Sequence, residues 1–215
     1  MDRQMIFLAK TFGEEGGFQD DPNDKGNYYH GKLYGTIWGI TAANHFSTFQ
    51  KCYTLYEAGK IEESKKVAVL FYRVAGYWNP LYDIIMDVSL AFRIWDFGVN
   101  AGVVTSVKYV QQTIYKYYYP KIKVDGIFGT HTVTNLNRFS NKMVRKHLKQ
   151  SEIIPGETEF YTLYIRRLEK HYRSLKNFWR FGSGWLKRVR RVFNGLPDLY
   201  QPLDLDPRGF DYVKR

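Results

Sequence analysis

The sequence predicts a mostly α protein of the α+β type, with a small β-hairpin near residues 18–40 and a helical C-terminal part. Apolar side chains recur at helical spacing in several segments, whereas residues 18–39 are crowded with Gly, Asp, Asn and Pro. The chain has 215 residues, of which 44% are hydrophobic. This length and composition suit one domain or two small ones with a substantial core.

The elements are expected in a definite order. A first helix is predicted over residues 3–13, and the glycines at positions 16 and 17 end it. Tyr28-Tyr29 and Leu33-Tyr34 are expected to form short strands of a hairpin. Further helices are predicted at residues 42–58, 61–75, 81–100 and 104–118, with a turn at Asn79-Pro80. After a loop at 120–130, most of the chain to residue 193 is expected to be helical, and the prolines in the last 20 residues predict a surface tail.

Several classes of protein are excluded or disfavoured by composition. No run of 18 apolar residues exists, so no membrane-spanning helix is expected. The N-terminal apolar stretch is too short for a secretory signal. The one cysteine, Cys52, rules out an internal disulfide and is expected to be a small buried residue. The five histidines show no i, i+4 pair, so no metal site is predicted.

The positive charge is concentrated in the C-terminal part of the chain. Residues 138–193 contain fifteen Lys or Arg, four Glu and no Asp, whereas the whole chain has a formal net charge of +11. Residues 1–60 are nearly neutral, which suggests a chemical half and a docking half. A basic protein concentrates near nucleic acid, anionic membranes or anionic wall polymers, and charge alone does not choose among them.

Three residues form a candidate catalytic group. Glu15 follows the first helix, where the helix dipole and neighbouring Glu14 disfavour a carboxylate and raise its pKa, as a general acid requires. Phe18 and Tyr28 can add apolar shielding. Asp24 lies nine residues further on, in a polar loop where it can stay ionised.

Thr36 offers a hydroxyl that can help Asp24 orient a water molecule. Two carboxyls in contrasting environments are typical of glycosidic bond cleavage. The plainer alternative is that the Glu-Gly-Gly segment is an ordinary solvated helix end and that the Asp, Gly and Asn residues only form turns.

The order of these residues resembles glycoside hydrolase family 108, a family of phage-type lysozymes. The matching segments are Glu15-Gly16-Gly17-Phe18, Asp20-Asp21-Pro22-Asn23-Asp24-Lys25-Gly26 and Thr36-Ile37-Trp38-Gly39-Ile40-Thr41. Phe18 stands where the family has Tyr, Asp20 where it has Asn, and Asn27 where it has the second Gly of a pair. About eight extra residues separate Gly26 from Thr36; this insertion is expected to lengthen the hairpin, and it leaves Glu15 and Asp24 in register with the family.

A second region resembles the peptidoglycan-binding segment that follows these hydrolases. It comprises Asp96-Phe97-Gly98-Val99-Asn100-Ala101-Gly102, Val110-Gln111-Gln112 and Asp125-Gly126-Ile127-Phe128-Gly129-Thr130-His131-Thr132. The resemblance implies a lysozyme-like catalytic region at 1–90, a helical region at 91–193 that completes the fold, and a tail at 194–215. Tyr28 and Asn100 are the candidate substrate-binding residues, although a helix-terminal role for Asn100 is equally compatible with its position.

The resemblance implies a peptidoglycan hydrolase that cleaves between N-acetylmuramic acid and N-acetylglucosamine, with Glu15 as the general acid and neither metal nor organic cofactor. Its expected partner is peptidoglycan, with anionic wall polymer or a membrane surface for the basic C-terminal part and no specific nucleic acid. It implies a phage or prophage endolysin, made in the cytoplasm without a signal peptide and acting on the wall. Two alternatives remain open: a lytic transglycosylase, and a non-catalytic wall- or nucleic-acid-binding protein on the same fold.

Overall fold

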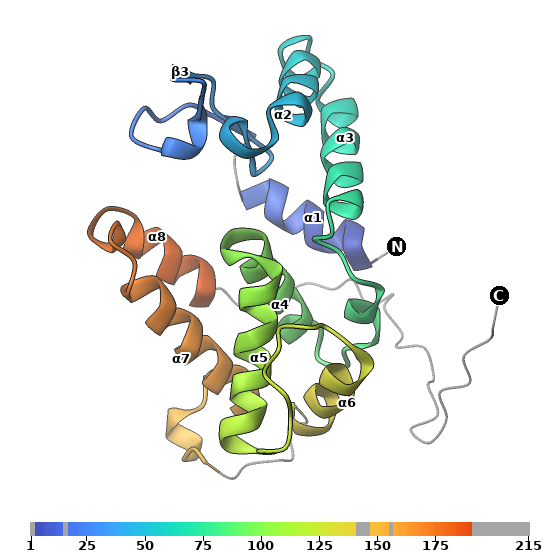
Figure 1. Cartoon of the computed structure of the whole chain (residues 1–215), viewed down its shortest axis with the longest axis vertical. Helices are drawn as coiled ribbons and strands as arrows, with labels where there is room; N and C mark the ends of the chain where they lie inside the picture. The colour runs from blue at the N-terminus through green and yellow to red at the C-terminus, as the bar shows by residue number, and fades with distance from the viewer. Residues whose placement is uncertain (1–2, 15–16, 141–146, 155–156, 191–215) are drawn as a thin grey trace, which may run out of the picture.

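The computed structural model describes residues 3–14, 17–140, 147–154 and 157–190. These residues form a mostly α protein with two small antiparallel sheets, as the sequence predicts. In Figure 1 the strands, α2 and α3 lie on one side of α1, and α4 to α8 lie on the other. The helices are α1 (Arg3–Glu14), α2 (Ala42–Glu57), α3 (Ile61–Val74), α4 (Val88–Ala101), α5 (Val103–Tyr117), α6 (Thr130–Phe139), α7 (Glu159–Arg173) and α8 (Phe178–Arg190).

The β region consists of five two-residue strands. They are β1 (Phe18–Gln19), β2 (Tyr28–Tyr29), β3 (Lys32–Leu33), β4 (Thr36–Ile37) and β5 (Ile40–Thr41). One sheet has the order β1-β4-β5, and β2 pairs with β3. The turn between β2 and β3 has positive φ at His30 and Gly31, and the turn between β4 and β5 has it at Trp38 and Gly39. Two consecutive positive φ values match the right-handed twist of the flanking strands.

The predicted helix over 81–100 is wrong in its first turns. Pro80–Ile84 form a 3₁₀ helix, and α4 begins only at Val88. The reason is capping: the Asn79 side chain accepts from the Leu81 N–H, and the Asp87 side chain accepts from the Leu90 N–H at 2.9 Å. The expected C-terminal helix is also divided into α6, a short 3₁₀ helix at Gln150–Glu152, α7 and α8.

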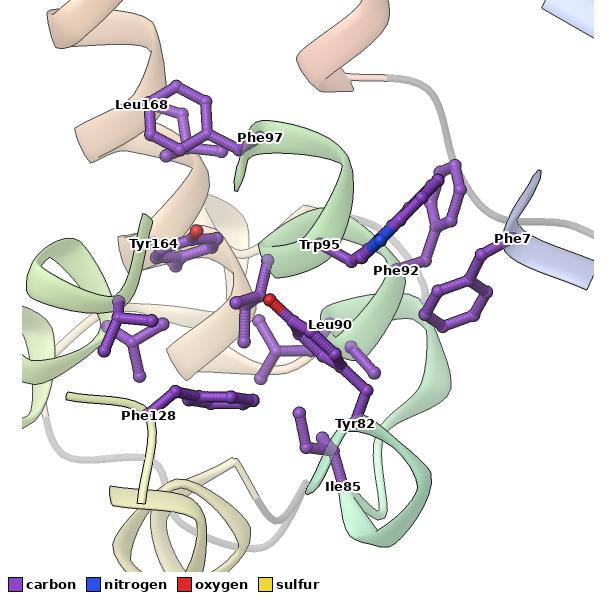
Figure 2. Packing of buried hydrophobic residues seen from close by; sticks show 14 of the residues in the cluster. Phe7, Tyr82, Ile85, Leu90, Phe92, Trp95, Phe97, Phe128, Tyr164 and Leu168 are labelled. Atoms are coloured by element: carbon purple, nitrogen blue, oxygen red, sulfur yellow. The ribbon is translucent and has the colours of Figure 1, made fainter. Parts of the chain in front are cut away.

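Aromatic packing fixes α1 against α4. Phe7 is fully buried, with ring centroids 5.2 Å from Phe92 and 5.8 Å from Trp95, and Figure 2 shows these rings together. Close to Phe7 in the chain, the guanidinium of Arg3 donates to the carbonyls of Tyr82 and Ile85. Because large buried aromatic rings contribute strongly to packing, these contacts fix the first turns of α1 against α4 and the 3₁₀ helix before it.

A single buried cluster extends from α1 to α8, and the expected boundary at residues 90 and 91 falls within α4. The division into regions 1–90 and 91–193 stays a prediction, and the proposed tail lies outside the described residues. Cys52 is fully buried, as expected, and desolvation raises the pKa of its thiol to about 11. No helix in the described part of the chain is long and apolar enough to cross a membrane.

Gly35 offers a test of the packing beside β4. Its φ is +120°, and a Cβ there would lie 2.5 Å from Phe18 and 2.6 Å from the Gln19 carbonyl oxygen. We expect Gly35→Ala to lower the free energy of unfolding by at least about 2 kcal/mol. The backbone around position 35 must move to make room for the Cβ, and the alanine must also adopt a strained φ. Urea unfolding followed by circular dichroism measures this loss.

Gly31→Ala is the matched control. Gly31 also has positive φ, +76°, but a Cβ there meets nothing within 4 Å. Gly31→Ala should lower the free energy of unfolding only by the cost of the strained φ, roughly 1 kcal/mol. Equal losses for the two variants would contradict the close packing of Gly35 on β1.

Candidate active site

The loop that carries Asp24 lies between β1 and β2. Asp24 caps a short 3₁₀ helix at Lys25–Asn27, and its Oδ1 accepts from the Gly26 N–H at 2.9 Å. Its Oδ2 lies 3.4 Å from Nε2 of Gln19, a long contact that leaves this oxygen able to accept from water. Both oxygens of the half-buried carboxylate are therefore oriented by named donors.

Asn27 occupies the centre of this loop and is fully buried. Its amide forms a reciprocal pair with the amide of Gln19, at 2.9 and 3.1 Å. Its Nδ2 also donates to the Asp21 carbonyl at 2.9 Å, and its Oδ1 accepts from the Thr36 hydroxyl at 2.7 Å. Each of these atoms has a partner, as burial of a polar side chain requires.

The backbone of Asn27 adds contacts to both neighbouring segments. Its N–H donates to the Asp24 carbonyl at 3.0 Å, and its own carbonyl accepts from the Tyr34 and Gly35 N–H groups at 2.8 and 3.0 Å. Asn27 thus joins the Asp24 loop to the start of β4. The sequence marked Asn27 only as a departure from the family's Gly-Gly pair, and it gave no sign that this side chain is buried.

Thr36 lies in the same group of residues, in contact with Asn27. It is 8% exposed and stands directly opposite Gln19 in the register of β1 and β4. Its hydroxyl proton is donated to Asn27, so the hydroxyl can only accept from a further group. Its predicted role in orienting water for Asp24 stays a prediction.

The two predicted substrate-binding residues lie on different elements. Tyr28 belongs to β2, and its hydroxyl donates to the Pro22 carbonyl at 3.0 Å, which braces the Asp24 loop. Asn100 is exposed near the end of α4, and its amide donates to the Asp96 carbonyl at 2.7 Å. The structure therefore brings Asp24, Thr36 and Tyr28 together. Asn100 instead makes a hydrogen bond within the end of α4, which is the helix-terminal alternative to substrate binding.

Glu15 lies outside the described residues, so its predicted role as general acid stays a prediction. Its described neighbours in the chain are Glu14, the last residue of α1, and Gly17. The Gly17 carbonyl accepts from the Trp38 N–H at 3.0 Å, which joins this part of the chain to the turn between β4 and β5.

Aromatic side chains line the α2 side of this region. Phe18 packs on Tyr53, with ring centroids 4.8 Å apart, and the ring of Tyr56 lies against Gly17. Desolvation raises the pKa of the Tyr53 phenol, with further contributions from Glu57 and Asp20. Phe18 is therefore packed on α2, and its expected shielding of Glu15 stays a prediction.

A residue from the other end of the chain also reaches the loop. The guanidinium of Arg180, on α8, lies 3.5 Å from the Asp21 carboxylate. Hydrogen bonds from Asn23 lower the pKa of Asp21, and the charge of Arg180 lowers it further. The two residues are 159 positions apart, so no local sequence pattern pointed to the contact.

The segment around Asp125, which resembles part of a peptidoglycan-binding region, is held by structural hydrogen bonds. Nε2 of Gln111 donates to the Asp125 carboxylate at 2.9 Å and to the Thr132 hydroxyl at 3.1 Å, and the Ile127 N–H also donates to Asp125. These bonds shape the loop before α6. Within the described ranges, no group of three His, Cys, Asp or Glu could hold a metal ion.

The fold places the protein in a class: it is a mostly α protein with a lysozyme-like fold. The solved "Structure of Brucella abortus SagA" is similar to it, with a TM-score of 0.54 and 20% sequence identity over 87% of this chain and 91% of that chain. At this identity, the likeness establishes the fold. No curated protein matches the chain.

The family follows from the sequence of the N-terminal region. Residues 8–102 match the model of the family described as glycosyl hydrolase 108. This match to the N-terminal part of the chain identifies the protein as a glycoside hydrolase. The matched region begins within α1 at residue 8, contains β1 to β5 and the Asp24 loop, and ends directly after α4.

Removing the Asn27 side chain tests whether its hydrogen bonds hold β1, the Asp24 loop and β4 together. We expect Asn27→Ala to lower the free energy of unfolding by about 3 kcal/mol, because it leaves the Gln19 amide, the Asp21 carbonyl and the Thr36 hydroxyl without their partner. Thr36→Val is the control, since it removes one hydroxyl and should cost about 1 kcal/mol. Denaturant unfolding of both variants measures the difference, and equal losses would show that Asn27 has no central role.

Proposed function

We propose that the protein is an N-acetylmuramidase that cleaves the β-1,4 glycosidic bond between N-acetylmuramic acid and N-acetylglucosamine in peptidoglycan. The glycosyl hydrolase 108 domain supports a peptidoglycan hydrolase of lysozyme type. The choice of bond and the roles of individual residues are the proposal. In it the protein is bacteriolytic and acts at the cell wall.

The observation that carries the proposal is the fixed orientation of Asp24 beside the segment that follows α1. Its carboxylate is oriented by Gly26 and Gln19, and Gln19 lies four residues after Glu15 in the chain. An acid after the first helix and an oriented carboxylate on the next loop are the two groups that glycosidic cleavage needs.

In the proposed mechanism, Glu15 protonates the glycosidic oxygen as the bond to the sugar breaks. Asp24 accepts a proton from a water molecule and stabilises the oxocarbenium-like transition state. The long contact between Asp24 Oδ2 and Gln19 leaves that oxygen available to the water. Thr36 helps to orient the same water molecule, and its hydroxyl is held beside the Asp24 loop by its hydrogen bond to Asn27.

Substitution of the two carboxyls tests these roles. We expect Glu15→Gln to reduce the clearing of cell-wall suspensions by about 10²- to 10⁴-fold, because it removes the general acid. Asp24→Asn keeps an oxygen that can cap the Gly26 N–H, so it should also lose activity without losing the fold. Circular dichroism checks the fold, and turbidity measures the activity.

Glu62→Gln is the matched control. Glu62 is an exposed carboxylate on α3, in an i, i+3 pair with Lys65. This variant should clear walls at the wild-type rate. Full clearing by Glu15→Gln would refute the proposal.

Mass spectrometry of the products identifies the reaction. Reducing N-acetylmuramic acid ends are expected of the hydrolase. Anhydro ends would instead indicate a lytic transglycosylase, and no release of muropeptides by the wild type would indicate a non-catalytic binding protein.

A further inference from the structure

An exposed tryptophan lies at the start of α8, next to the connection from α7. Trp179, in the first turn of α8, is 81% exposed, whereas the other four tryptophans of the chain are buried or half-buried. Leu175, on the connection itself, is 36% exposed. Tryptophan is enriched at binding surfaces, because its ring offers a large apolar face and its indole N–H a polar group.

Positive charge surrounds this tryptophan. Residues 170–190 contain seven Lys or Arg and no Asp or Glu. Three of these cations pair with carboxylates elsewhere: Arg180 with Asp21, Arg188 with Asp96 and Arg190 with Glu169. At the end of α7, the exposed Arg173 lies over the ring of Phe178, and Lys176 is exposed on the connection. We call Arg173, Leu175, Lys176 and Trp179 the α7–α8 surface.

This surface is held in place beside the Asp24 loop. At the far end of α8, Arg188 donates to the buried Asp96 carboxylate at 2.7 Å, and Trp185 stacks on Tyr172. At the near end, Arg180 contacts Asp21, whose carbonyl accepts from the Asp24 N–H at 3.0 Å. Figure 1 shows the start of α8 facing the β region.

We propose that the α7–α8 surface is an accessory binding site for the glycan strand of peptidoglycan. The face of the Trp179 indole stacks on a sugar ring, and Arg173 and Lys176 pair with carboxylates of the stem peptides. This proposal rests on the proposed function. A strand bound at Asp24 passes beside Asp21 and Arg180 and so reaches Trp179, which favours the glycan over a separate anionic membrane surface.

The experiment measures binding without cleavage. Glu15→Gln protein is mixed with purified insoluble peptidoglycan, and the bound fraction is measured by co-sedimentation. Adding Trp179→Ala should raise the dissociation constant at least about fivefold, as expected for an aromatic anchor. Trp179→Phe keeps an aromatic face and should restore most of the binding. In the active protein, Trp179→Ala should raise KM for walls and leave kcat unchanged.

Met86→Ala is the matched control, because Met86 is 76% exposed and lies between the 3₁₀ helix at Pro80–Ile84 and α4. Its binding should stay at the parent value. If Trp179→Ala binds walls as tightly as Met86→Ala, the proposal is overturned. It is also overturned if Trp179→Ala loses only binding to phosphatidylglycerol vesicles, because the surface then docks on lipid.

Failure of the proposed function gives a different result. If the wild type releases no muropeptides but its binding to walls still depends on Trp179, the accessory site stands and the catalytic proposal falls. If Trp179 has no effect and the wild type does release muropeptides, only the accessory site is refuted.

Discussion

The burial of the Asn27 amide is the constraint on which the candidate site depends. A polar side chain that is fully removed from water must have its donors and acceptors paired, and here the partners come from β1, the Asp24 loop and β4. Satisfying one side chain therefore fixes three segments relative to one another. The orientation of Asp24 follows from this, since Gln19 contacts both Asn27 and Asp24.

The aromatic core supplies the second requirement, the position of α1. Phe7 packs on Phe92 and Trp95 of α4, so the helix that precedes Glu15 is fixed on α4 (Figure 2). The strands that follow are fixed on α2 through rings such as Phe18 and Tyr53. The segment between α1 and β1 thus joins two packed parts of the fold, a common location for the active site of an enzyme.

The C-terminal half takes part in the candidate site as well as in the core. The glycosyl hydrolase 108 match ends at residue 102, yet Arg180 of α8 contacts the loop that carries Asp24. An exposed ion pair contributes little to stability by itself. Its significance is positional, because α8 is separately fixed by Arg188 on the buried Asp96. The C-terminal half, which the charge distribution suggested is for docking, therefore also contacts the loop of the candidate catalytic region.

The sequence by itself determined the helices, the small β region and the order of the acidic motif, because these follow from spacing and from residues close together in the chain. It predicted the helix over 3–13 well, but extended α4 into residues 81–87, where two side-chain caps favour a 3₁₀ helix and a later start. Only the tertiary structure revealed the buried Asn27 and the contact between Arg180 and Asp21. Both depend on how distant segments pack, and neither burial nor a contact across 159 positions leaves a local pattern.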